Sequence, residues 1–186
     1  VDQLIKTDIS KIKEAEWESI DKGIHSDVKG QKLRVLTSIV DSNNEELIEL
    51  VPLKASAGYT SGYADPDYLK VLPTFHLPFL SKDRKYRSFP IKGDSMHPWV
   101  KDGDVVIGEY VEHPKMVRNN CCYIILTKDD GLVYKRVYTN KLDEGYLVLS
   151  SDNKLYKPYQ VHLSEVLEIW EFKLNLCIGQ YEEDEL

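Results

Sequence analysis

The sequence has little cysteine and no long apolar run, and each shortage excludes a class of protein. Its three cysteines in 186 residues include the adjacent pair Cys121 and Cys122, which gives neither a disulfide framework nor the spacing of a metal site. We therefore expect reduced, partly buried thiols. No stretch approaches the roughly 18 apolar residues that span a bilayer, and the first residues lack the basic and apolar regions of a signal peptide. We expect a cytoplasmic protein with no membrane partner.

Positive charge is also scarce. The formal net charge is -7 at pH 7, and residues 182–185 are all acidic. Binding to the phosphate backbone of DNA needs clustered lysine and arginine, so we do not expect this chain itself to bind DNA. The five histidines are scattered without zinc spacing, and no glycine-rich loop could cradle a phosphate. The sequence therefore predicts no metal and no cofactor.

Short apolar runs between turn residues predict a mainly β fold of several small, curved antiparallel sheets. Isoleucines on one helical face predict a linker helix over residues 7–22, so we divide the chain into a helical linker at 1–31 and a β domain at 32–186. Strands at 33–40 and 47–52 should form a hairpin, followed by a long, proline-rich connection. Later strands are expected at 88–91, 105–110, 121–127, 132–137, 146–150 and 166–174.

One serine stands where the chain should present it rather than bury it. Gly93 lets the backbone turn sharply before Ser95, and Pro98 prevents strand pairing after it. A serine hydroxyl is inert at neutral pH unless a base takes its proton. His97 is close in sequence, but catalytic bases normally come from a separate element of the fold, so we expect it to be a rim residue.

Lys135 is the candidate base. Strand alternation places it on one face with Val133 and Val137. A lysine in apolar surroundings loses the hydration of its charged form, so its pKa falls and the neutral amine can accept a proton. Alternation also allows an ordinary lysine whose stem reaches out into water from an edge strand, and it does not decide between the two.

Several motifs, in this order, resemble those of the LexA and phage-repressor family of self-cleaving Ser-Lys peptidases, over roughly residues 33–175. They are Gly-Asp-Ser-Met-x-Pro at 93–98, Asp-Gly-Asp at 102–104, Val-Tyr-Lys-Arg-Val at 133–137, and Ser151-Asp152-Asn153 with Tyr156 and Pro158. The sequence departs from the family pattern at Trp99, at Lys154 and in a longer connection containing Gly62, Asp65 and Pro66. None of these departures removes a catalytic group.

The resemblance implies a mechanism. Ser95 would attack the carbonyl of Ala57 and cut the Ala57-Gly58 bond, with Lys135 as base. The backbone N–H groups of Asp94, Ser95 and Met96 are the expected donors to the oxyanion. The side chains of Asp94 and Asp104 are expected to be structural, accepting backbone N–H bonds in turns.

The resemblance also implies partners. We expect a homodimer formed through the β domain, with strand 169–176 offering apolar residues, and operator DNA bound by a helix-turn-helix domain ahead of Val1. The family's trigger is a RecA filament on single-stranded DNA. Three alternatives stay open: an UmuD-like polymerase accessory, a signal-peptidase-like enzyme, and a non-catalytic dimerisation or sensing module.

Overall fold

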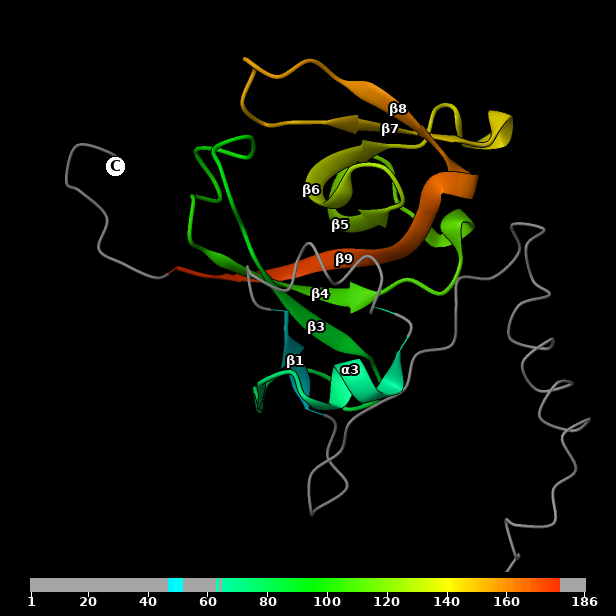
Figure 1. Ribbon diagram of the computed structural model, residues 1–186. Coiled ribbons are helices and arrows are strands. Elements are labelled where there is room, and N and C mark those ends of the chain that lie inside the picture. Colours follow the sequence, from blue (N-terminus) through cyan, green and yellow to red (C-terminus); the bar gives the residue numbers. More distant parts are fainter. Residues whose placement is uncertain (1–46, 52–62, 64, 178–186) are drawn as a thin grey trace, which may run out of the picture. The chain divides into compact units, whose positions relative to one another are not determined.

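The computed structural model describes residues 47–51, 63 and 65–177 (Figure 1). Within them, nine strands form one hydrogen-bonded sheet in the order β2-β1-β3-β4-β9-β5-β6-β7-β8. The strands are β1 (Ile48–Leu50), β2 (Thr74–Phe75), β3 (Tyr86–Pro90), β4 (Val105–Tyr110), β5 (Cys121–Thr127), β6 (Gly131–Tyr138), β7 (Tyr146–Ser150), β8 (Tyr159–His162) and β9 (Val166–Leu176). The described helices are α3 (Pro66–Lys70) and 3₁₀ turns at Pro114–Met116, Leu142–Glu144 and Leu163–Glu165. No helix in these ranges is long and apolar enough to cross a membrane.

The predicted mainly β fold is confirmed, and β4, β5 and β7 have the predicted bounds. The strands expected in several small sheets are instead joined in one, because β9 pairs antiparallel with both β4 and β5. Register shifts at 107/108 and 126/127 interrupt these two ladders, and β9 bends along its length (Figure 1). The short strands β2 and β8 were not predicted. The linker helix, the boundary at 31/32 and strand 33–40 lie outside the described residues.

The expected hairpin would pair β1 with a strand at 33–40, but β1 is bonded to two other strands. It pairs antiparallel with β2 and parallel with β3, with Leu50 opposite Ser88 in the parallel pair. The hydrogen bond from Val51 N to Ser88 O is 3.0 Å, and that from Leu50 N to Pro73 O is 2.8 Å. The chain that leaves β1 therefore returns to the same strand at Pro73.

Alternating strand residues supply the two larger apolar cores of the described residues, one on each face of the sheet, and a third, smaller core surrounds Ile107. In β5, Tyr123 and Ile125 belong to one core, while Ile124 and Leu126 belong to the other. The predicted alternation in β6 is confirmed, because Val133 and Val137 pack with the first set and Leu132 and Tyr134 with the second. Cys121 and Cys122 likewise point to opposite cores, and both are partly buried as expected.

A buried ionic network ties β1 to the sheet. Glu49 in β1 is wholly buried, and its carboxylate accepts a 2.7 Å hydrogen bond from Lys85 Nζ and a 3.4 Å bond from Arg87 Nε. Arg87 Nη1 lies 3.7 Å from Glu168 Oε2, and its guanidinium stacks 4.7 Å from the centre of the Trp170 ring. Removing either partner of such a pair would leave a buried charge without compensation, so the network favours β1 in this position.

The strand we expected to offer apolar residues to a second copy is largely occupied within the chain. Ile169 and Trp170 are fully buried in the two cores. Beyond Glu171, β9 pairs with β4 and not with β5, and at residues 166–168 it pairs with β5 and not with β4. The homodimer stays a prediction, and these few residues are what β9 has left to contribute to it.

Gly108 marks a close approach of β4 to β9. A Cβ added there would lie 2.6 Å from Trp170 Cβ and 3.0 Å from Ile124 Cδ1. Trp170 is packed edge-on against both Phe89 and Tyr110, so it has little room to move. We expect Gly108→Ala to lower the free energy of unfolding by about 2 kcal/mol or more through overpacking.

Urea unfolding of the full chain in a Ser95→Ala background, which cannot cut itself, measures this effect. The control is Val71→Ala, which shortens a side chain that is 77% exposed and should change stability by less than about 0.5 kcal/mol. If both substitutions had equally small effects, the packing at Gly108 would be looser than described.

Candidate active site

Ser95 lies in a loop between β3 and β4 that is fastened at its base. Ile91 N donates to Asp104 O at 2.7 Å, and Gly103 N donates back to Ile91 O at 3.0 Å. Gly93 and Gly103 adopt positive φ angles of 85° and 87°, which explains glycine at both positions. The buried side chains of Met96 and Val100 anchor the loop in the core, so Ser95 is held half-buried beside them.

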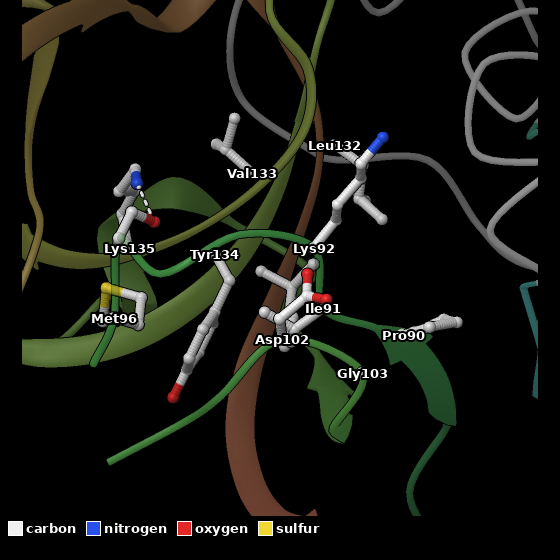
Figure 2. Close-up of a pocket in the computed structure, with 12 residues that line it drawn as sticks. Pro90, Ile91, Lys92, Met96, Asp102, Gly103, Leu132, Val133, Tyr134 and Lys135 are labelled. Atoms are coloured by element: carbon white, nitrogen blue, oxygen red, sulfur yellow. Dashed lines mark hydrogen bonds between the residues drawn. The ribbon is translucent and has the colours of Figure 1, made fainter. Parts of the chain in front are cut away.

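Lys135 meets Ser95 from β6. Its Nζ donates a 2.7 Å hydrogen bond to Ser95 Oγ, across 40 residues of sequence (Figure 2). Burial lowers the pKa of the Lys135 amine, since the charged form loses hydration. Lys135 is half-buried and its amine is bonded to Ser95, so the alternative of a lysine reaching out into water is wrong. The predicted contact is present, and the catalytic roles of the two groups stay a prediction.

The two residues lie at a cleft of about 540 Å³ with largely apolar walls. Figure 2 shows Met96 and Tyr134 on the same side as Lys135, with Leu132 and Val133 above them. The full lining is Pro90, Ile91, Lys92, Ser95, Met96, Asp102, Gly103, Ile124, Leu132, Val133, Tyr134 and Lys135. Such a cleft suits an extended apolar peptide segment whose backbone passes the serine hydroxyl.

The two flanking aspartates differ in what they bind. Asp104 Oδ2 accepts the backbone N–H of Lys101 at 3.0 Å, so the expected structural role of Asp104 is confirmed. Asp94 also has side-chain partners that were not expected: its carboxylate accepts from the Tyr156 hydroxyl at 2.5 Å and from the Asn153 side chain at 3.3 Å. The Tyr156 bond lowers the pKa of the Asp94 carboxyl and raises the pKa of the Tyr156 hydroxyl. Local pattern could not reveal these partners, which lie about 60 residues away.

Other predicted site residues fall into three groups. His97 is exposed, as expected for a rim residue. Among the described residues, the structure records no acceptor for the backbone N–H groups of Ser95 and Met96, two of the three expected oxyanion donors. Ala57 and Gly58 lie outside the described residues. In the same described ranges, no group of three or more His, Cys, Asp or Glu side chains could hold a metal ion.

Comparison with known families agrees with this geometry. Residues 49–170, more than half of the chain, match the model of the Peptidase S24-like family. The chain belongs to this family, to which the C-terminal domains of LexA, UmuD and phage repressors also belong. A search of curated proteins found no match. The resemblance inferred from the motifs is therefore confirmed at the level of the peptidase domain.

Proposed function

We propose that this chain is the self-cleaving and dimerising part of a cytoplasmic, LexA-like or phage-repressor-like transcription regulator, and that it cuts its own Ala57-Gly58 bond. The observation that carries the proposal is the 2.7 Å hydrogen bond from Lys135 Nζ to Ser95 Oγ, together with the lowered pKa of the lysine. A neutral amine in that position can take the hydroxyl proton.

The reaction follows from these groups. Neutral Lys135 removes the Ser95 proton as Oγ attacks the Ala57 carbonyl carbon, and the N–H groups of Ser95 and Met96 stabilise the oxyanion. The C–N bond then breaks, and the Lys135 ammonium gives its proton to the Gly58 amine. Water, deprotonated by Lys135, hydrolyses the remaining ester between Ser95 and Ala57. The products are a carboxylate at Ala57 and an amine at Gly58.

The strand register supports attack within one chain. Leu50 in β1 lies opposite Ser88 in β3, and the two strands run parallel, so both leave the sheet at the same end. Ala57 follows Leu50 by 57 - 50 = 7 residues, and Ser95 follows Ser88 by 95 - 88 = 7 residues. Seven residues span at most about 23–25 Å, so the chain from Leu50 to Ala57 has the same maximum reach as the chain from Ser88 to Ser95.

The core supports the same conclusion. Val51 is buried in the core that contains Met96 and Tyr134, and Tyr63 and Leu69 pack in that core as well. The bond therefore lies between two anchors, six residues after Val51 and five residues before Tyr63. Both anchors belong to the core beneath the serine loop.

The regulatory role rests on family membership. Cleavage after Ala57 would separate a DNA-binding domain, expected ahead of this chain, from the dimerising domain. A repressor dimer holds two operator half-sites at once, so losing the link removes that avidity without changing the DNA-binding fold. A RecA filament is the proposed trigger, and a second copy of the chain is the proposed partner.

The direct test is to hold the purified chain at alkaline pH for days. We expect products of 57 and 186 - 57 = 129 residues, formed at a rate that does not depend on protein concentration. Ser95→Ala should stay intact, because it lacks the hydroxyl oxygen that attacks the Ala57 carbonyl. The matched control is His97→Ala, which should cut at the unmodified rate. An intact chain, or a cut elsewhere that Ser95→Ala does not prevent, would favour the non-catalytic module.

A further inference from the structure

The loop between β7 and β8 holds the backbone around the serine. Asn153 N donates to Ser95 O at 3.1 Å, and Asn153 Nδ2 donates to Asp94 O at 3.2 Å. The same amide reaches the Asp94 carboxylate at 3.3 Å, and the Tyr156 hydroxyl donates to the other carboxylate oxygen at 2.5 Å. Asn153 and Tyr156 of the loop between β7 and β8 therefore make four hydrogen bonds to Asp94 and Ser95 of the serine loop.

The loop is itself fixed to the strand that carries the lysine. The neighbour of Asn153, Asp152, accepts two hydrogen bonds from Arg136, at 2.7 and 2.9 Å. Arg136 follows Lys135 in β6. A ring of contacts thus runs from Lys135 through Arg136, Asp152 and Asn153 to Ser95, and closes at the hydrogen bond between Ser95 and Lys135.

Peptide planarity gives these bonds a second effect. The carbonyl of Asp94 shares a rigid plane with the N–H of Ser95, and the carbonyl of Ser95 shares one with the N–H of Met96. In each trans peptide the C=O and N–H point in opposite directions. Asn153 binds both carbonyls, so it sets the direction of both N–H groups.

We propose that Asn153 and Tyr156 are positioning residues for the Ser95 nucleophile and its oxyanion donors. Asn153 orients the two peptide planes, and Tyr156 holds the Asp94 side chain against the same loop. The inference rests on the proposed self-cleavage and assigns these residues a task in it. Tyr156 also places its ring centre 5.8 Å from Lys135 Nζ, beside the base that the serine must meet.

The test measures two reactions of Ser95 in the full chain. One is self-cleavage, and the other is phosphonylation by a small fluorophosphonate, in which Oγ bonds to phosphorus, fluoride leaves and Lys135 takes the proton. The reagent needs the oriented serine and oxyanion donors but not the cleavage segment. We expect Asn153→Ala to slow both reactions by the same factor, roughly 10- to 100-fold, since loss of a direct oxyanion donor costs about 10²- to 10³-fold. Tyr156→Phe should slow both by about tenfold.

Matched variants separate positioning from folding. Leu155→Ala, which shortens an 88% exposed side chain in the same loop, should react like the unmodified chain. Tyr156→Phe removes one oxygen from an exposed residue, so it should not disturb folding. It therefore tests the positioning role even if Asn153→Ala folds poorly. In the background of Asp94→Ala, Tyr156→Phe should have no further effect, because its partner is already absent.

The outcomes distinguish the inference from the proposed function. If the unmodified chain reacts in both assays and the variants react equally fast, the inference is overturned and self-cleavage stands. Slower cleavage with unchanged phosphonylation also overturns it, because the variants would then act on the cleavage segment. If the unmodified chain is phosphonylated but never cut, self-cleavage fails and phosphonylation alone decides the inference. If it undergoes neither reaction, both fail.

Discussion

Lys135→Ala should leave the chain intact at every pH at which the unmodified chain cuts itself. Lys135 Nζ is the group that donates to Ser95 Oγ, and only its neutral form can take the serine proton. Because burial lowers the pKa of this amine, the neutral form becomes abundant at a lower pH than for an ordinary lysine. The cleavage rate should therefore rise with pH through the depressed pKa and level off above it.

Cleavage rates measured from neutral to alkaline pH check this profile. Lys128→Ala, which removes an exposed lysine just beyond β5, is the matched control and should keep the unmodified profile. A rate that falls as pH rises, or cleavage that survives in Lys135→Ala, would assign the proton transfer to another group.

Arg87→Met should cause the largest loss of stability among the substitutions considered. Arg87 is wholly buried between Glu49 and Glu168, which are also wholly buried. Removing the cation leaves two buried carboxylates with less compensation, and breaking such a pair typically costs about 3–5 kcal/mol. Methionine keeps much of the apolar stem of arginine, so the loss of stability reports mainly on the removed positive charge.

The measurement is urea unfolding in a Ser95→Ala background, which prevents cleavage during the experiment. Arg84→Met is the matched control, because this arginine is 59% exposed and lies 3.7 Å from Glu109. Exposed ion pairs contribute about 0–1 kcal/mol, so the control should be nearly as stable as its parent. Equal losses in the two variants would mean that the buried network is hydrated.

Much of the fold and the central contact could be predicted from local pattern. Apolar runs between turn residues located β4, β5 and β7, and the motifs around Ser95 and Lys135 identified the pair that the structure joins. Alternation could not decide whether Lys135 was buried, because that depends on a loop arriving from 40 residues away.

The remaining features depend on contacts that no local pattern encodes. Glu49, Arg87 and Glu168 look like residues of solvated strand faces, and they become a buried network only because β1, β3 and β9 lie near one another in the same sheet. The parallel pairing of β1 with β3 needs a connection through residues whose composition indicates only a long loop. The partners of Asp94 could not be predicted without knowing where the loop after β7 lies.

The place of β1 in the sheet would change what the proposed self-cleavage accomplishes. Strand β1 lies between β2 and β3, so a cut after Ala57 would leave it on the shorter product while both neighbouring strands belong to the longer one. The shorter product would then be held as a non-covalent peptide, hydrogen-bonded on both edges and anchored by the Glu49 ion pairs. Bond breakage and separation of the pieces are therefore distinct events. The lifetime of the cut complex would be set by how fast the three-residue strand β1 dissociates from β2 and β3.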